Sequence, residues 1–547
     1  MRDRITVSVM TLWTLWTLWL LGCSGKTLPA TTDGDTAHSD AGLWQSGPIQ
    51  CADPDARSSE GRLYTPDLGA DWLAQPGEGH PYGSGIAVED FNGDGWLDLF
   101  LPDATTCLLY FGSSDGTLAS AEVPTLCGGA AATAMDVDGD GDIDLLVSSR
   151  MDADQLFIND GTGRFADEAS ERGLGGDTTY SSGFSPGDID GDGDVDLFWS
   201  YHGTLNEERV PELGAANRLL LNDGDGFFRE DSAQLSDAAR LAYTFLASWL
   251  DVDADGDLDL YQNNDYGAYA LPNVLLSNDG DGNLSTAAPA GVQLAINGMG
   301  TGIGDANDDG LPDLLVTDWG SVHLLLSDGD GGWYDAAAAL GLSLSEDRVT
   351  SWAAELVDMD NDSLLDAAAT FGPLTNSPVL EGYDNNPSDQ PDALWIQQPD
   401  GSFIESSQSW GFDDTTLGRG MVIADLDQDG WLDTIKRDFR GGPSRISLAR
   451  CGEAGWLTIR LEGTAPNTQA IGAKVTIESN NRRQLRWVQP ASTGFASSAP
   501  AQLHFGLGDT DLIDAIQITW PGGDTTRYTD IPALQHLVVT QADAPIE

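Results

Sequence analysis

Basic residues are scarce in this chain. Its 547 residues include 25 Lys and Arg against 88 Asp and Glu, which gives a formal net charge of −63. The lysines are only Lys26, Lys436 and Lys474. Binding to DNA or RNA needs clustered positive charge on the protein, and electrostatic attachment to anionic lipid needs the same. The charge balance therefore excludes nucleic acid as a partner and excludes a polybasic membrane contact.

Catalytic signatures are missing as well. The six histidines form no H-E-x-x-H or other ligand spacing, and no Walker loop or dinucleotide fingerprint occurs. One G-x-S-x-G pattern covers residues 112–116, but a nucleophile elbow needs a strand before it and a helix after it. Here the pattern falls in an expected hairpin turn. We therefore expect a protein that is not an enzyme.

Long apolar runs are absent after the first 22 residues, so nothing later is expected to span a bilayer. Residues 1–22 combine Arg2 and Arg4 with an apolar stretch, which is typical of a signal peptide. The Leu-Leu-Gly-Cys that follows resembles the lipobox of bacterial lipoproteins and implies lipidation of Cys23. An uncleaved anchor with an incidental cysteine is the competing interpretation. Ser24 resembles an outer-membrane sorting signal, so we expect a lipid-anchored protein of the bacterial cell envelope, at the outer membrane or cell surface.

The rest of the chain divides into three parts by composition. Residues 23–50 are low in complexity and hold little to bury, so we expect a flexible tether. The remainder is rich in aromatics, with 17 Trp, 16 Phe and 12 Tyr, and a chain disordered by its charge would lack them. We expect two folded domains, over residues 51–450 and 451–547.

An aspartate repeat dominates the larger domain. The pattern D-x-[D/N]-x-D-[G/S]-x-x-D recurs seven times, with starts 46 to 67 residues apart. Positions one, three, five and nine of the seven copies are Asp90, Asn92, Asp94 and Asp98; Asp136, Asp138, Asp140 and Asp144; Asp188, Asp190, Asp192 and Asp196; Asp251, Asp253, Asp255 and Asp259; Asp305, Asn307, Asp309 and Asp313; Asp358, Asp360, Asp362 and Asp366; Asp425, Asp427, Asp429 and Asp433.

Oxygen ligands at this spacing suit a hard cation. Ca²⁺ takes six to eight oxygens at about 2.3–2.6 Å, and alternate residues of a tight loop can face one point. Glycine at position six allows the positive φ of a sharp turn, and Ser363 replaces it in the sixth copy, where we expect a strained or weaker loop. The motif predicts about seven Ca²⁺ sites, weaker in the copies that carry Asn92 and Asn307. Solvated acidic turns are the alternative.

The flanks of the motif indicate β-strands. These loops are not EF-hands, because position twelve is never Glu and no helices flank them. Runs of small residues precede the motif, and apolar β-prone runs such as L-D-L-F-L follow it. Most units then carry an Asn-Asp-Gly or Ser-Asp-Gly hairpin turn and a fourth short strand. Four-stranded units repeated four to eight times form a β-propeller.

The seven units resemble FG-GAP/VCBS-type repeats, the calcium-loop blades known from integrin α-subunit propellers. The resemblance implies an all-β fold, with a seven-bladed propeller and a calcium loop in the first hairpin of each blade. Blade seven shows only three expected strands, near residues 421–424, 432–436 and 446–448. Residues 61–66 resemble the last strand of an earlier blade, and we expect them to complete blade seven.

The C-terminal part alternates as strands, including W-L-T-I-R-L, A-K-V-T-I-E and I-Q-I-T-W. Together with the segments I-G-A-K-V-T, L-H-F-G-L-G-D and I-T-W-P-G-G, these strands resemble the ASPIC/UnbV module. The pairing with the repeats is typical of the cartilage acidic protein-like family. It implies an extracellular, calcium-loaded binding protein with a small C-terminal β-sandwich-like domain.

Four cysteines remain besides Cys23, and an even number in an exported chain favours disulfides. Of the three pairings we favour Cys107–Cys127 and Cys51–Cys451. The first would join the expected blades one and two. The second would fasten the strand that closes blade seven.

The longest insertions, about residues 201–216, 264–273 and 371–391, all follow the second strand of a blade. In a meander these loops share the face opposite the calcium loops. Their aromatic residues, together with one from blade five, are candidate anchors for an extracellular protein or glycan: Tyr201, Tyr266, Tyr269, Trp319 and Tyr383. Tolerated loop growth is the alternative. The competing functions are a polysaccharide-acting enzyme on the propeller face and a structural component of the envelope.

Overall fold

The computed structural model describes residues 39–40, 43–49, 62–66, 68, 84–103, 107–114, 116–123, 127–149, 153–175, 181–203, 216–287, 291–329, 332–344, 348–373, 390–415, 417–439, 444–491 and 494–541. Every structural statement below concerns these residues. The expected signal peptide, Cys23, Cys51 and Tyr383 lie outside them.

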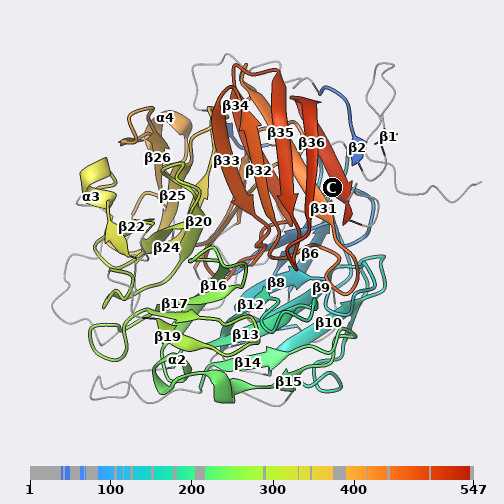
Figure 1. Ribbon diagram of the computed structural model, residues 1–547, viewed down its shortest axis with the longest axis vertical. Coiled ribbons are helices and arrows are strands. Elements are labelled where there is room, and N and C mark those ends of the chain that lie inside the picture. The colour runs from blue at the N-terminus through green and yellow to red at the C-terminus, as the bar shows by residue number, and fades with distance from the viewer. Residues whose placement is uncertain are drawn as a thin grey trace, which may run out of the picture.

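Antiparallel sheets of four strands follow one another along the larger domain, and we number the seven described sheets as blades one to seven (Figure 1). The strands of blades one to three are β4 (Ala87–Glu89), β5 (Asp98–Leu101), β6 (Leu108–Phe111) and β7 (Ala119–Ser120); β8 (Ala131–Met135), β9 (Asp144–Ser148), β10 (Gln155–Asn159) and β11 (Phe165–Asp167); β12 (Ser181–Gly187), β13 (Asp196–Tyr201), β14 (Arg218–Leu221) and β15 (Arg229–Glu230). Those of blades four to six are β16 (Thr244–Leu250), β17 (Asp259–Asn264), β18 (Val274–Ser277) and β19 (Ser285–Ala287); β20 (Thr301–Gly304), β21 (Asp313–Thr317), β22 (Val322–Ser327) and β23 (Trp333–Asp335); β24 (Ser351–Val357), β25 (Asp366–Phe371), β26 (Ala393–Gln397) and β27 (Phe403–Glu405).

Blade seven takes its fourth strand from the other end of the domain. It consists of β28 (Gly418–Ala424), β29 (Asp433–Asp438), β30 (Arg445–Ala449) and β3 (Leu63–Tyr64). Leu63 pairs with Ala449 and Tyr64 with Leu448 in antiparallel register. The prediction that residues 61–66 complete this blade is confirmed at these two positions.

Hydrogen bonds connect each described blade to the next and return from blade seven to blade one. They join Gly85 N to Ala130 O, Thr133 Oγ1 to Phe184 O, Ser185 Oγ to Ala247 O, Asn263 Nδ2 to Gly300 O, Thr317 Oγ1 to Trp352 O, Thr370 Oγ1 to Arg419 O and Ser84 Oγ to Asp438 O, at 2.6–3.0 Å. The sheets therefore close into a ring. The predicted all-β propeller fold is confirmed.

The inner strands show why small residues precede each aspartate motif. All five residues of β8, A-A-T-A-M, are buried, because first strands converge on the ring axis. The second strands, such as D-L-L-V-S in β9, are buried along their whole length, since each is covered by blades on both faces. This explains continuous apolar runs where a one-sided sheet would alternate.

The C-terminal domain is a β-sandwich. One sheet contains β31 (Gly455–Glu462), β34 (Gln502–Gly508) and β37 (Gln535–Thr540), and the other contains β32 (Lys474–Ser479), β33 (Arg482–Trp487), β35 (Leu512–Thr519) and β36 (Thr525–Pro532). Alternating apolar residues of the two sheets, including Val475, Ile477 and Phe505, form its core.

Two N-terminal strands extend the first of these sheets, so the expected tether is wrong at its end. β1 (Ser39–Asp40) pairs with β2 (Leu43–Gln45), and β2 pairs with β37. Leu43 is buried in the sandwich core. Composition did not predict this strand, because Leu43 is its one fully buried side chain.

Helices are few and short in the described residues. They are η1 (Ser232–Gln234), α2 (Asp237–Arg240), α3 (Ala337–Leu340) and α4 (Ser407–Trp410), each after the fourth strand of a blade. None of the described helices has the length and apolarity needed to cross a membrane.

The sandwich is docked on the calcium-loop face of the ring, a placement that the sequence did not predict. Its strands, orange to red, stand against the ring in Figure 1. Segment 494–499 enters the ring axis, where Gly494 and Thr301 exchange backbone hydrogen bonds and Ser498 pairs with β4. The ring of Phe495 lies 5.4 Å from Phe245 and 5.3 Å from Trp352, measured between ring centroids. The C-terminal domain therefore plugs the propeller.

The disulfide Cys107–Cys127 is present, with Cα atoms 5.4 Å apart, and joins blades one and two as predicted. Cys451 is also disulfide-bonded. Its predicted partner, Cys51, lies outside the described residues. Disulfides of this kind are typical of chains that fold in an oxidising, extracytoplasmic compartment.

Candidate metal centres

The seven aspartate motifs form seven loops of one geometry between the first and second strands of the blades. Position six has positive φ in every copy, from +81° at Ser363 to +101° at Gly256, as predicted. Position four is also left-handed in every copy, which sequence reasoning missed, with φ between +57° and +72°. The signal was present, since this position holds Gly, Asn, Asp, Ala or Gln and never a β-branched residue.

Position nine fastens the loop to its blade. Its side chains are at most 1 % exposed. In blade two, Asp144 Oδ2 accepts a hydrogen bond from Val137 N at 2.9 Å, and Asp144 Oδ1 accepts one from Asn159 N at 2.8 Å. The same pair of bonds occurs in all seven blades. This aspartate thus orders both the loop and the neighbouring hairpin.

Positions one and five use backbone donors of the loop itself. In blade seven, Asp425 accepts from Asp429 N at 3.0 Å and from Gly430 N at 2.9 Å. Asp429 in turn accepts from Trp431 N at 2.9 Å. These bonds curl the loop so that alternate carboxylates face its centre.

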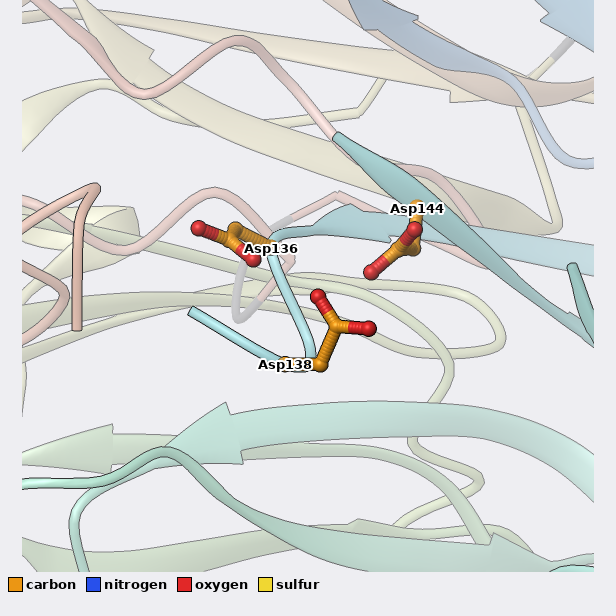
Figure 2. Close-up of side chains that lie close together, drawn as sticks. All are labelled: Asp136, Asp138 and Asp144. Carbon is orange, nitrogen blue, oxygen red and sulfur yellow. The ribbon is translucent and has the colours of Figure 1, made fainter. Parts of the chain in front are cut away.

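Carboxylates converge in five of the loops. One oxygen from each of three aspartates lies within 4.8 Å of the other two in the sets Asp136, Asp138 and Asp144; Asp188, Asp190 and Asp196; Asp251, Asp253 and Asp255; Asp358, Asp360 and Asp366; Asp425, Asp427 and Asp433. Figure 2 shows Asp138 on the loop and Asp144 at the start of β9 pointing toward one another, with Asp136 beside them. Each of these clusters could hold a metal ion.

The donors fit a hard divalent cation. One carboxylate oxygen is buried without a hydrogen-bond partner in each of Asp138, Asp190, Asp251 and Asp360. Buried polar atoms are normally paired, so these oxygens fit a role as ligands of a cation. The loops of blades one and five place Asn92 and Asn307 at position three, and they lack the third carboxylate that completes the clusters elsewhere.

Burial raises the pKa of these carboxyl groups strongly when no cation balances them. The pKa reaches about 8 for Asp98, about 9 for Asp196 and about 8 for Asp313. For Asp358 burial is again the main cause, and neighbouring Asp362 and Asp360 add to it, so that its pKa is about 8. A bound cation would favour the ionised forms and remove this cost.

In four blades, an amide side chain at the end of the third strand donates a hydrogen bond to the preceding calcium loop, a contact that the sequence analysis missed. Asn159 Nδ2 donates to Phe91 O of the preceding calcium loop at 2.8 Å, and Asn222 Nδ2 donates to Val137 O at 3.0 Å. Asn278 and Gln397 repeat the contact with Ile189 O and Ala306 O, each at 2.8 Å. The same hydrogen bonds therefore support the calcium loops and hold neighbouring blades together.

The predicted partner-binding residues have different environments. Tyr201 is fully buried against Trp199, so its prediction as an exposed anchor is wrong: it is the last residue of β13, not part of the loop. Tyr269 is 76 % exposed, while Tyr266 and Trp319 are half-buried. Tyr266 lies 5.5 Å from the ring of His202, whose Nε2 is 3.0 Å from Asp265 Oδ2. The structure thus brings Tyr266 and Tyr269 together on blade four.

A serine, a histidine and an aspartate line up at the edge of blade five. Ser321 Oγ is 3.1 Å from His323 Nε2, and His323 Nδ1 is 2.7 Å from Asp335 Oδ2. Ser321 Oγ also donates to Asp318 Oδ2 at 3.2 Å. Although burial opposes the charge on His323, hydrogen bonds to Asp318 and Asp335 raise its pKa. His323 thus lies within ion-pair distance of both Asp318 and Asp335, at 3.5 and 2.7 Å.

Comparison with known families matches both parts of the chain. The FG-GAP-like repeat matches residues 90–147, 136–199, 251–316 and 305–369, which include the first six aspartate motifs. The ASPIC and UnbV family matches residues 463–546, within the sandwich.

Individual relatives and solved structures share between 16% and 27% sequence identity with this chain. Cartilage acidic protein 1 of Mus musculus is 26% identical over 274 residues, covering 48% of this chain and 40% of that protein, and that of Xenopus tropicalis is 27% identical over 290 residues with the same coverage. The chain thus matches well under half the length of these relatives. A lectin of Agrocybe aegerita that recognises terminal N-acetylglucosamine aligns with a TM-score of 0.37 and 16% identity, over 67% of this chain and 94% of its own. The chain carries FG-GAP-like repeats followed by a C-terminal ASPIC and UnbV domain, and Cartilage acidic protein 1 is among its homologues.

Proposed function

We propose that this protein is a calcium-loaded extracytoplasmic binding protein that engages an extracellular protein or glycan on the propeller face opposite the calcium loops. Calcium is favoured over softer metals because every candidate ligand in the loops is oxygen. The orphaned, buried carboxylate oxygens carry the calcium assignment.

The choice of face rests on the position of the C-terminal domain. That domain covers the loops of blades two, six and seven on the calcium-loop face and fills the axis with Phe495, so less of that face is left for a large partner. The opposite face keeps the exposed Tyr269 and the half-buried Tyr266 beside the His202–Asp265 pair. Aromatic rings with adjacent polar groups are common anchors for proteins and sugars.

A lipid anchor at Cys23 would orient the propeller face opposite the calcium loops away from the membrane. Only 15 residues separate Cys23 from Ser39, the first residue of β1. They reach at most about 55 Å even when fully extended. The sandwich would therefore lie nearer the membrane, and the face opposite the calcium loops would point away from it.

The test uses the soluble chain from residue 24, so that β1 and β2 are retained. We expect capture of a partner in a pull-down or a glycan screen in calcium, and loss of that capture with Tyr266→Ala and Tyr269→Ala combined. Tyr334→Ala is the matched control, because Tyr334 is 52 % exposed on the outer strand β23. Capture that survives the double substitution would assign the binding site elsewhere. Calcium content of the purified protein, measured by atomic emission, tests the metal assignment separately.

A further inference from the structure

We propose that the C-terminal domain is a lid over calcium sites two, six and seven, so that ions bound there leave only when the domain undocks. The inference rests on the calcium binding proposed above. It adds that domain docking and calcium loading are coupled, and that the seven sites fall into two kinetic classes.

Side chains of the sandwich touch the calcium loops directly. In loop two, the Thr468 hydroxyl donates to Asp136 Oδ2, and Asp136 N donates to Gln469 Oε1 at 3.0 Å. Asp136 is a position-one ligand candidate, so the domain shares an atom of the metal cluster. A movement of the Asp136 carboxylate therefore alters a contact of the docked domain directly.

Loop six is contacted by both side-chain and backbone atoms of the sandwich. Asn361, at position four, bonds His504 Nε2 through its side chain at 2.6 Å and accepts from Gly508 N at 2.7 Å. A Cβ atom on Gly506 would lie 2.1 Å from Asp358 Oδ2, so only glycine allows β34 to pass this carboxylate. The backbone of the C-terminal domain thus forms one wall of the sixth site.

Loop seven is covered in the same way. His536 Nε2 is 3.1 Å from Gln428 O, at position four of the loop. The indole of Trp456 lies against Gly430, where a Cβ would be 1.7 Å from Trp456 Cε2. Asp425 and Asp433 are 2 % and 1 % exposed.

A cavity of about 140 Å³ lies between the two domains at sites six and seven. Asp358 and Asp425 line it from the propeller, and Arg486 and His504 line it from the sandwich. The inner side of both clusters therefore faces this interdomain space. A calcium ion that leaves must regain its water shell, and here the domain boundary has to open to supply it.

The coupling has a simple physical origin. Without calcium, the clustered carboxylates repel one another, and the loop relaxes from the shape that the domain contacts. Loss of calcium therefore weakens docking, and by reciprocity undocking weakens calcium binding. The exposed Asp253 and Asp255 of loop four have weaker linkage, because the sandwich meets this loop at Leu258, where a Cβ built on Gly472 would lie 3.5 Å away.

The experiment measures calcium release from the full folded chain after mixing with a fluorescent chelator. We expect a fast phase and a slow phase, with sites two, six and seven in the slow one. Phe495→Ala removes the axial anchor without touching any ligand and should speed the slow phase about tenfold or more, because truncating a buried aromatic strongly weakens its packing. Ile404→Ala, at a residue 54 % exposed on β27, is the control and should change neither phase.

Hydrogen exchange of the wild-type protein supplies a second readout if Phe495→Ala fails to fold. The amides of residues 494–499 should exchange faster in chelator than in calcium. A single release phase, or a slow phase unchanged by Phe495→Ala in a protein whose 494–499 amides have lost protection, overturns the lid. A chain that binds no calcium instead overturns the proposed function, so the two failures are distinguishable.

Discussion

The loops of blades four and six carry the same aspartate motif in opposite surroundings. Asp253 and Asp255 in blade four are exposed, and nothing lies within 4 Å of a Cβ built on Gly256. Their counterparts in blade six, Asp360 and Asp362, are half-buried, and Asp358 is 2 % exposed beneath the backbone of β34. The motif thus sets which atoms can bind an ion, whereas a domain joined much later in the chain sets how that ion is enclosed.

Removing calcium should have the largest effect and should separate the two loops in time. Each site at 100 times its Kd adds about 2.7 kcal/mol, so seven independent sites give an upper bound near ~19 kcal/mol. We expect a large fall in melting temperature in EGTA, measured by calorimetry. Hydrogen exchange during chelation should show blade four losing protection before blade six. Simultaneous loss would remove the distinction between open and covered loops.

A matched pair of substitutions should sharpen the comparison. Asp358→Asn and Asp253→Asn each remove one candidate ligand charge. We expect the first to lower the free energy of unfolding by about 3 kcal/mol or more in calcium, because it affects both the site and domain docking. The second should cost about 1–2 kcal/mol, because Asp253 is exposed. Urea unfolding in calcium measures both, and equal losses would contradict the docking contribution.

The pH dependence of the chelated protein follows from the raised pKa values. Asp358 has a folded pKa of about 8, and Asp259 in blade four about 7, both above an unfolded Asp and both raised mainly by burial. Between the unfolded and folded pKa the native state binds more protons, so stability falls as pH rises. In EGTA the melting temperature should therefore drop from pH 5.5 to pH 8.5.

Calcium should reverse that trend, because the ion binds ionised carboxylates in place of protons. The gap between melting temperatures with and without calcium should widen with pH. Asp358→Asn should flatten the slope in EGTA more than Asp253→Asn does. A chelated protein that grows more stable toward pH 8.5 would contradict the assigned burial of these groups.

Backbone strain gives the smallest expected effect. Ser363 in the covered loop has φ +81°, and Ala254 in the open loop has φ +60°. Glycine adopts such angles without the steric cost of a Cβ, so Ser363→Gly and Ala254→Gly should each stabilise the protein by about 0.5–1 kcal/mol. Denaturant midpoints in calcium test this, with Gly183→Ala as a reference substitution away from the loops. Destabilisation by either change would show that the serine or alanine side chain has a contact of its own.

The sequence sufficed for the parts of the fold that repeat locally. The motif positions, the positive φ at position six and the strand Leu63–Tyr64 could be predicted, since each depends on a pattern seen several times in the chain. The cover over Asp358 could not, because it arises from a single contact with Gly506, far along the sequence.

Two further errors have the same cause. Tyr201 was placed in a loop because the insertion begins near it, but β13 extends to that residue and buries its ring. The low complexity of residues 23–50 predicts a tether that includes Leu43, whereas this residue lies in a strand whose partner, β37, starts at Gln535. Long-range pairing leaves no periodic signal in so short a segment.

The N-terminal strands pair with strands far along the chain, so the ring and the sandwich cannot form until those partners have been synthesised. Leu43–Gln45 needs Leu537–Val539 as its partner, and Ser46 Oγ accepts a hydrogen bond from His536 N, 490 residues later. Leu63–Tyr64 similarly waits for Leu448–Ala449. At about 5–20 residues per second, a ribosome needs roughly half a minute to two minutes to reach the last strand. The ring cannot close before Ala449 has been synthesised, and the sandwich cannot be complete before Val539, so the nascent chain remains open for most of its synthesis.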